Sequence, residues 1–228
     1  SALKTVAIVS MVIDHIAVAF LDGTATQEPF LRVLSFIMHA AGRLAFPLFL
    51  FLMIEGIRHT GNMIKYLSRM AVFAVISEVP FDLCFFGKIW YPEKQNTLFT
   101  LTVCLAVLIL IKRLYETDRM TVGWKTVLSV PVITAGCVLA EVLHFDYGAL
   151  AVAAAVLMYA FSNKNIAGYC AGTAVLMLGD LSEAFAFLTV PLVALYNGQR
   201  GRGHKYFFYV FYPAHIMILW LIKLMLRA

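Results

Sequence analysis

Six ionisable side chains lie within apolar stretches of the sequence, where water would not solvate a charge if the stretches are buried. They are Asp14, His15, His39, Arg43, Glu78 and Asp82. A charged group at the centre of a bilayer costs roughly 2.5–3.5 kcal/mol on insertion scales, so each of these groups needs a partner or a role. Residues four apart share one face of a helix, which puts His39 beside Arg43 and Glu78 beside Asp82. We therefore predict that the six side chains converge on one cavity.

The residue types of this cluster suit general acid–base catalysis. A histidine can act as the base, a carboxylate can stabilise the imidazolium that forms, and an arginine can stabilise an oxyanion. His15 is the predicted base, oriented by Asp14 or by the two acids of the third apolar stretch, with His39 as its rival and Arg43 at the oxyanion. Two simpler interpretations stay open: Arg43 pairs with an acid only to hold helices together, or His15 is a neutral histidine bonded to a neighbouring helix.

A second cluster combines positive charge, glycine and turn residues, which is typical of a phosphate-binding site. Its members are Arg58, His59, Asn197, Arg200, Arg202 and Lys205. The alternative is an ordinary basic loop beside a membrane. Tyr212 and His215 follow on one helical face and are predicted to line the same interior path. The four cysteines lie far apart without a CxxC or CxxH pair, so we expect no metal site.

The elements that position these residues are predicted to be membrane helices. The chain is 62% hydrophobic and only 14% charged, with a mean hydropathy of +0.85, which excludes a water-soluble fold. We predict an all-α, polytopic membrane bundle that forms a single domain over residues 1–228. About nine spanning helices (eight to ten) are expected, at residues 4–21, 31–54, 64–87, 97–115, 122–143, 147–161, 166–180, 182–196 and 205–226.

The distribution of lysine and arginine predicts an orientation for these spans. With nine spans, twelve of these residues fall on the side of the N-terminus and five on the other, with Arg43 buried. Cytoplasmic loops carry such an excess, so the N-terminus is expected in the cytoplasm. The basic balance of +5 is then explained by loops near anionic lipid, and we expect no nucleic-acid partner. The six intramembrane groups would lie between the midplane and the outer half of the bilayer.

The chain resembles the TraX family of integral membrane proteins over nearly its full length. The resemblance rests on several motifs in order: KTVAIVSMVIDHI at 4–16, GRLAFPLFLFLMIEGIRHT at 42–60, SEVPFDL at 77–83, QNTLFTL at 95–101, DYG at 146–148 and YNGQRGRGHKYFFYVFYPAH at 196–215. That family is linked to acetylation of the N-terminus of conjugative pilin, which implies a multi-pass protein of the bacterial inner membrane. It is also similar to a broader superfamily of transmembrane acyltransferases, in which a histidine of an early span is catalytic, and His15 of the DHI motif occupies that place.

The residues and the resemblance together predict an acetyltransferase that takes its acyl group from cytoplasmic acetyl-CoA. The phosphates of this substrate would bind near Arg200, Arg202 and Lys205, and the acceptor would be a pilin N-terminal amine or a cell-envelope glycan at the outer face. Two other classes stay open at this point. A proton-coupled transporter would use the same acids and histidines as a relay, although no internal repeat is visible. A membrane scaffold for an assembly machine would need the charges only for folding.

Overall fold

The computed structural model describes residues 2–22, 28–199 and 207–226, and these residues are almost entirely helical. The one strand-like pairing in the described ranges is an isolated bridge between Gln95 and Phe145. The elements are α1 (Ala2–Phe20), α2 (Pro29–Gly42), α3 (Ala45–His59), α4 (Met63–Phe86), α5 (Thr97–Glu116), α6 (Val122–Val142), α7 (Gly148–Ala160), α8 (Asn165–Leu176), the 3₁₀ helix η1 (Leu181–Thr189), α9 (Val190–Ala194) and α10 (Phe207–Met225). The prediction of an all-α fold is confirmed.

Every predicted span coincides with helical structure in the described ranges, but two of them are divided. The second one breaks at Arg43 and Leu44 into α2 and α3. Pro47 explains the break, because proline has no N–H to donate to the carbonyl of residue 43 and is tolerated in the first turn of a new helix. The eighth one is a 3₁₀ helix that passes into the short α9. The prediction of one continuous helix across 31–54 was therefore wrong.

Five segments among the described residues are long and apolar enough to cross a membrane. They are Ala2–Leu21, Pro29–His59, Thr97–Glu116, Val122–Val142 and Phe207–Met225. Their outward faces carry large apolar side chains: on α6 alone, Val122, Trp124, Val127, Val130 and Val142 are all more than half exposed. A helix with such a surface cannot face water, because a soluble protein rarely exposes large contiguous apolar patches. The molecule is a multi-pass membrane bundle.

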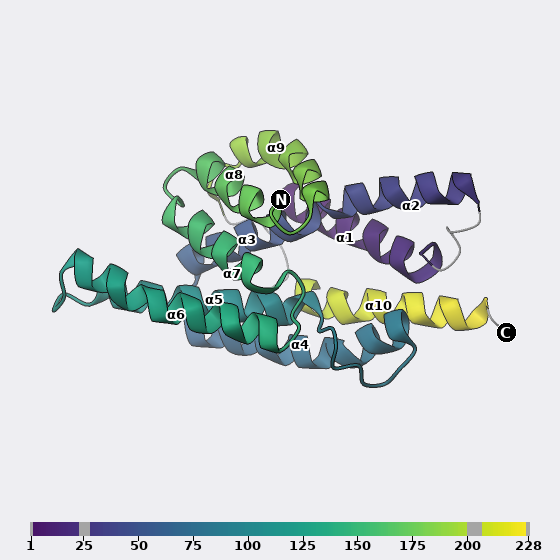
Figure 1. The fold of residues 1–228 in the computed structure, drawn as a ribbon, viewed down its shortest axis with the longest axis horizontal. Coiled ribbons are helices and arrows are strands. Elements are labelled where there is room, and N and C mark those ends of the chain that lie inside the picture. The colour runs from purple at the N-terminus through teal and green to yellow at the C-terminus, as the bar shows by residue number, and fades with distance from the viewer. Residues whose placement is uncertain (1, 23–27, 200–206, 227–228) are drawn as a thin grey trace.

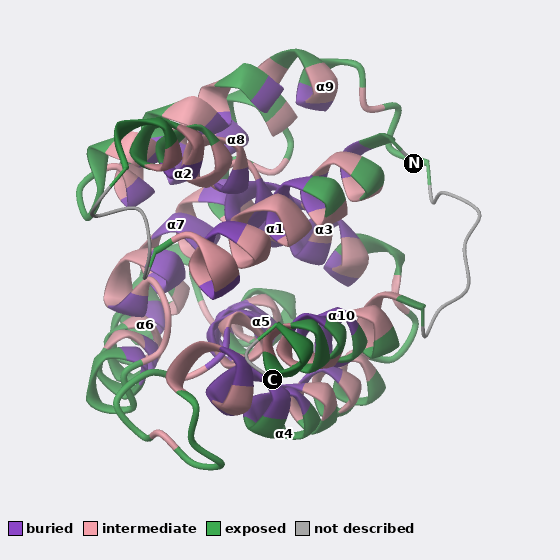
Figure 2. Cartoon of the chain, turned by 90° about the vertical axis from the view of Figure 1, so that its right-hand side faces the viewer, coloured by how far each residue is buried: buried purple, intermediate pink, exposed green. Residues whose placement is uncertain are grey.

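The helices form an elongated bundle in which α1 and α3 lie centrally (Figure 1). Seen end-on, the buried residues gather on α1, α3, α5 and α7, whereas α6 and the outer faces of α4 and α10 are exposed (Figure 2). Helices α4, α5 and α10 pack on one side of α1 and α3, and α2, α8 and α9 lie on the other. We call the end where α1 begins and α3 finishes the Lys4 end, and the end where α1 finishes and α2 begins the Asp22 end.

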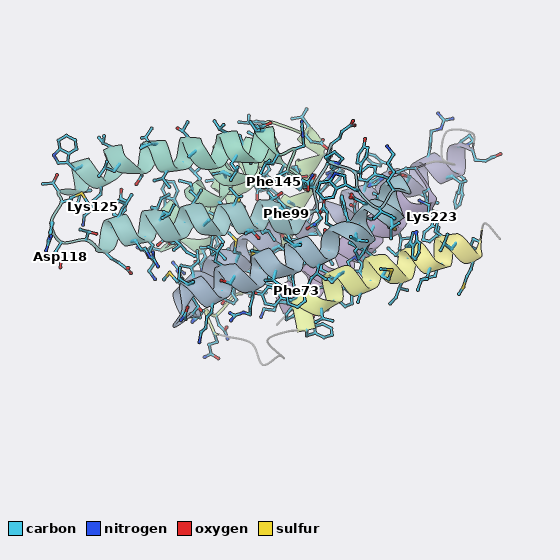
Figure 3. The ribbon with its side chains drawn as sticks, turned by 90° about the horizontal axis from the view of Figure 1, so that it is seen from below. Phe73, Phe99, Asp118, Lys125, Phe145 and Lys223 are labelled. Carbon is cyan, nitrogen blue, oxygen red and sulfur yellow. The ribbon has the colours of Figure 1, made fainter. Side chains whose placement is uncertain are left out.

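Helix α10 is fixed along α4, and Figure 3 shows the two side by side with Lys223 near the end of α10. Lys223 Nζ donates a hydrogen bond of 2.9 Å to the carbonyl of Cys84, near the end of α4. Nearer the middle of the bundle, Phe99 of α5 stacks on Phe145 of the α6–α7 turn at 5.6 Å between ring centroids. The first contact fixes the end of α10 to the end of α4, and the second fixes the start of α5 to that turn.

Helix α8 packs on α7 through a pair of glycines four residues apart. A Cβ added at Gly168 would lie 2.9 Å from the carbonyl oxygen of Met158, and one at Gly172 would lie 2.4 Å from the Met158 side chain. Helix α7 presents Ala151, Ala154 and Ala155 as buried residues. Small residues at this spacing let two membrane helices approach closely, where van der Waals contact stabilises the pair.

The substitution Gly168→Ala is expected to destabilise the bundle, because its Cβ meets backbone atoms that cannot rotate away. Overpacking of this kind costs about 1–3 kcal/mol, which should lower the midpoint of thermal unfolding in detergent by several degrees. Gly61→Ala is the matched control, since a Cβ there meets nothing within 4 Å. Equal midpoints for the two variants would show that the α7–α8 contact is not as close as described.

Candidate active site

A cavity of about 340 Å³ runs between α1, α3, α4, α5 and α10. At the Lys4 end its lining includes Lys4, His59, Thr60, Arg69 and Gln199. Toward the Asp22 end its lining includes Asp14, His15, Thr97, Asp146, Tyr147 and Tyr212. The walls between are mainly apolar side chains such as Phe49, Leu98 and Leu101. One continuous cavity thus joins a basic mouth to a polar, acidic end, and its size falls at the small end of the range for ligand sites.

His15 of α1 and His215 of α10 form a hydrogen-bonded pair at the cavity wall. His15 Nδ1 lies 2.7 Å from His215 Nε2, and the two rings stack at 4.9 Å between centroids and 7° between planes. His215 Nδ1 lies 2.9 Å from the carbonyl oxygen of Phe211, one turn earlier on α10. The rings of Phe85 and Tyr212 pack edge-on against His15. The pair is therefore held from both helices in apolar surroundings.

The partners of this pair determine where its protons lie. A carbonyl oxygen only accepts, so His215 Nδ1 must carry a proton and donate to Phe211. When both rings are neutral, His215 Nε2 is then an acceptor and His15 Nδ1 must be the donor between them. This leaves His15 Nε2 with a free lone pair on a ring that lines the cavity. The geometry thus orients His15 as a base.

Tyr212 lies beside this pair and offers a hydrogen-bond donor. Its side chain is 5% exposed and lines the cavity. Its hydroxyl lies beside Thr97 but makes no well-formed hydrogen bond among the described residues. A buried hydroxyl without a well-formed bond is costly, so this donor can turn to a group that enters the cavity. Tyr212 and His215 were predicted to line one interior path. Tyr212 lines the cavity, whereas His215 does not line it and instead bonds to His15.

Asp14 and His39 belong to a separate chain of hydrogen bonds between α1 and α2. His39 Nδ1 lies 2.8 Å from Asp14 Oδ1, and His39 Nε2 lies 2.9 Å from Asp22 Oδ1. Ser35 also donates to Asp22 Oδ1, at 3.1 Å. Gly42 permits this approach, because a Cβ there would lie 2.4 Å from Asp14 Oδ1. Asp14 therefore orients His39 and not His15, although both Asp14 and His15 line the cavity.

Arg43 is engaged by acids of the η1 region. Its Nη2 lies 3.0 Å from Asp180 Oδ2, and its Nη1 lies 3.4 Å from Glu183 Oε1. Tyr147 lies beside both Arg43 and Glu183. Arg43 lines a second cavity, with His39 and Ser182, and does not line the cavity of His15. The alternative that Arg43 pairs with an acid between helices therefore fits this geometry, with acids of the η1 region as its partners, whereas its predicted place at an oxyanion beside His15 does not.

The two acids of α4 hold the loop that follows the helix. Glu78 Oε2 accepts from the backbone N–H of Asn96 at 3.3 Å and also from its side-chain amide. Asp82 Oδ2 accepts from the backbone N–H of Tyr91 at 2.8 Å. Both acids are buried, and neither lines the cavity. The prediction that all six side chains share one cavity was wrong, because Glu78 and Asp82 bond to Asn96 and Tyr91 outside the cavity lining.

The predicted phosphate cluster is described only in part. Arg58 Nη1 lies 2.7 Å from Glu55 Oε1, and the guanidinium also donates to the carbonyl of Ser162, which ties α3 to the α7–α8 turn. His59 lines the cavity mouth. Asn197 Oδ1 accepts from the backbone N–H of Gln199 at 3.1 Å. The remaining residues of the cluster, Arg200, Arg202 and Lys205, lie outside the described residues.

Lys4 and Arg69 are cations of the cavity mouth that the sequence interpretation missed. Lys4 Nζ lies 4.9 Å from the centroid of the Phe208 ring, and Tyr209 lies beside Arg69. The sequence signal was available, since Lys4 lies in the first turn and Arg69 in the second turn of an apolar helix, but both were counted only toward the charge of the cytoplasmic side. No group of three or more metal-binding side chains occurs in the described ranges.

Comparison with known proteins places these observations in a family. The family model described as TraX protein matches residues 1–223. The chain is 28% identical to a protein of Dichelobacter nodosus named probable fimbrial assembly protein FimC, serogroup H1, over 99% of this chain and 96% of that protein. No solved structure matches the chain. Because the family model covers nearly the whole sequence, the chain belongs to the TraX family.

Proposed function

We propose that this chain is a membrane-embedded acetyltransferase that takes its acetyl group from acetyl-CoA on the cytoplasmic side and delivers it to an acceptor at the outer face. Nine crossings of the bacterial inner membrane, with the N-terminus inside, would put the Lys4 end in the cytoplasm. The observation that carries the proposal is the single cavity that joins a basic mouth to the lone pair of His15. A transferase needs such a path, because donor and acceptor approach from opposite sides.

The donor would enter at the Lys4 end. Lys4 and Arg69 supply positive charge at the mouth, beside the described start of the glycine-rich segment at Asn197. Phosphates of acetyl-CoA suit such a mouth, while the apolar walls of Phe49, Leu98 and Leu101 suit the pantetheine arm. The thioester would then lie next to His15. This arrangement keeps the nucleotide outside and brings only the reactive end into the bundle.

The chemistry would follow from the orientation of His15. As the acceptor attacks the thioester carbonyl, His15 Nε2 takes its proton, and His215 holds the ring in the required tautomer through Nδ1. The hydroxyl of Tyr212 would turn from Thr97 to donate to the developing oxyanion. In other enzymes, removal of one such donor lowers the rate about 10²–10³-fold. His15 then returns the proton to the leaving thiolate. We assign catalysis to His15 and Tyr212 and positioning to His215.

The acceptor end of the cavity favours an amine over a glycan hydroxyl. Asp14 and Asp146 both line this end, and carboxylates attract an ammonium group. Thr97 donates to Asp146 Oδ2 at 3.1 Å and Lys94 Nζ lies 3.7 Å from Asp146 Oδ1, so Asp14 is the carboxylate of this end without a lysine or arginine ion pair among the described residues. Membership of a family linked to pilin acetylation, and similarity to a protein named for fimbrial assembly, agree with a protein N-terminal amine. We therefore propose that class of acceptor.

The first test uses labelled acetyl-CoA with purified wild-type protein and with His15→Ala. Removal of the base is expected to lower transfer to a peptide with a free N-terminal amine by about 10²–10⁴-fold, the usual contribution of general base catalysis. The measurement is label gained by the peptide. Full transfer by His15→Ala would overturn the assignment of His15 as the base, and no transfer by the wild type to an amine or a sugar would sink the acetyltransferase proposal.

The role of His215 is tested by a pair of substitutions. His215→Phe removes the acceptor for His15 Nδ1–H, so the wrong tautomer becomes populated and kcat should fall about tenfold or more with KM for acetyl-CoA unchanged. His215→Gln keeps a side-chain oxygen that can accept this bond and should recover much of the rate. A change in KM alone, or equal rates for the two variants, would contradict a positioning role.

Donor binding at the Lys4 end is tested by thermal unfolding with coenzyme A. A ligand at a hundred times its Kd stabilises the native state by about 2.7 kcal/mol, so the midpoint of the wild type should rise. The rise should be smaller for Arg69→Gln, which loses a cation of the mouth, and unchanged for Arg113→Gln, an exposed arginine of α5 away from the cavity. A proton-coupled transporter would show no response to coenzyme A in any of the three proteins.

A further inference from the structure

The hydrogen-bond chain Asp14–His39–Asp22 links two carboxylates through both nitrogens of one imidazole ring. Both ring nitrogens of His39 face carboxylate oxygens, at 2.8 Å and 2.9 Å. Ionised carboxylates only accept, so two bonds require either a doubly protonated ring or one protonated acid. In either case the chain carries one proton more than a neutral histidine between two carboxylates. One proton can pass from one end to the other by entering the ring at Nδ1 and leaving it at Nε2, and a flip of the ring then restores the starting tautomer.

The two ends of the chain lie in different environments. Asp14 lines the cavity of His15. Asp22 follows the last turn of α1, and its side chain is 43% exposed. His39 lies between them and lines the second cavity, with Ser35 and Arg43. The chain thus leads from the reaction cavity to the surface at the Asp22 end.

The other charged groups around His39 do not interrupt this chain. On α2, Arg32 and Arg43 share its second cavity, and Arg43 is paired with Asp180 and Glu183 of the η1 region. Ser35 of α2 donates to Asp22, and Ser182 of η1 lines the same second cavity. On α1, the facing groups are the two carboxylates themselves, and Asp146 shares the first cavity with Asp14. The cations of α2 stabilise ionised carboxylates but cannot exchange a proton with them near neutral pH.

Acetylation of an ammonium group produces such a proton. The C–N bond to the acetyl carbon forms and the C–S bond of the thioester breaks, so R–NH₃⁺ and acetyl-CoA yield R–NH–acetyl, coenzyme A thiol and one H⁺. His15 accounts for the proton that passes from nitrogen to sulfur. The ammonium group must also lose a second proton. This proton leaves first, because only the neutral amine can attack the thioester. A hydroxyl acceptor would release none.

We propose that Asp14, His39 and Asp22 form a relay that takes the surplus proton of an ammonium acceptor from the cavity to the surface at the Asp22 end. This inference rests on the proposed acetyltransferase function and adds a second proton path that is separate from His15. Asp14 receives the proton, His39 passes it through its two nitrogens, and Asp22 releases it. A contact that only held α1 and α2 together would need just one of the two hydrogen bonds, and it would not need an exposed acid at its end.

The test measures acetyl transfer to a short peptide with a free N-terminal amine, below and above the pKa of that amine. An N-terminal amine has a pKa of about 7.7–8.0, so the peptide arrives as ammonium at about pH 6.5 and as neutral amine at about pH 9.5. His39→Gln keeps an amide that can donate to the carboxylates but does not exchange a proton. It is expected to slow kcat/KM about ten- to a hundredfold at the lower pH and to approach wild-type rates at the higher one.

Two further variants complete the design. Asp22→Asn, which blocks release at the surface, should show the same loss restricted to low pH. His144→Asn is the control, because this exposed histidine lines neither cavity and its left-handed backbone, with φ of 53°, tolerates asparagine. Equal loss for His39→Gln at both pH values, or no loss at either, would overturn the relay and leave the transferase proposal standing. Absence of transfer by the wild type at both values would overturn both.

Discussion

The constraint on which the rest of the structure depends is that a polar group inside an apolar bundle must find its partner within the protein. An unpaired carboxylate or imidazole away from water costs several kcal/mol, and bilayer lipid offers no hydrogen bonds. The chain meets most of this constraint with specific pairs. Glu78 bonds to Asn96, Asp82 to the backbone of Tyr91, and Arg43 to acids of the η1 region. The first two fix α4 to the segment that leads into α5, and the third fixes the start of α3 to η1, so bonds that lower the cost of burial also position the elements around the site.

Much of the fold could be predicted, because apolar length and turn chemistry are local properties of the sequence. The helical segments and the turns between them follow from runs of hydrophobic residues, and asparagine at 62 and 96 caps the helices that begin just after it. The break at Arg43 was missed, although Pro47 provided a signal three residues into the new helix. A proline in an apolar run permits either a kink or a new helix, and only packing against η1 and α1 selects between them.

The partners within the site could not be predicted in the same way. Spacing shows that two residues share a face of one helix, but it does not show which helix that face meets. Asp14 stands next to His15 in the chain, yet consecutive residues on a helix point in directions about 100° apart, so one reaches His39 and the other reaches His215. The sequence predicted His215 only as a residue of an interior path. Its hydrogen bond to His15 depends on the contact between α1 and α10, which is a tertiary property.

No carboxylate is hydrogen-bonded to His15 in the described part of the chain, and this has a chemical consequence. In the familiar serine protease arrangement a buried aspartate stabilises the imidazolium, but here the described partner of His15 Nδ1 is another histidine, with Phe85 and Tyr212 packed around the ring. An imidazolium in these surroundings is poorly stabilised, so a proton taken from the acceptor passes quickly to the next base that appears. In acyl transfer that base is the thiolate of the leaving group. A weakly stabilised His15 therefore suits a reaction in which one proton is taken and returned within a single turnover, while the carboxylates at the far end of the cavity remain available for the charge of the acceptor.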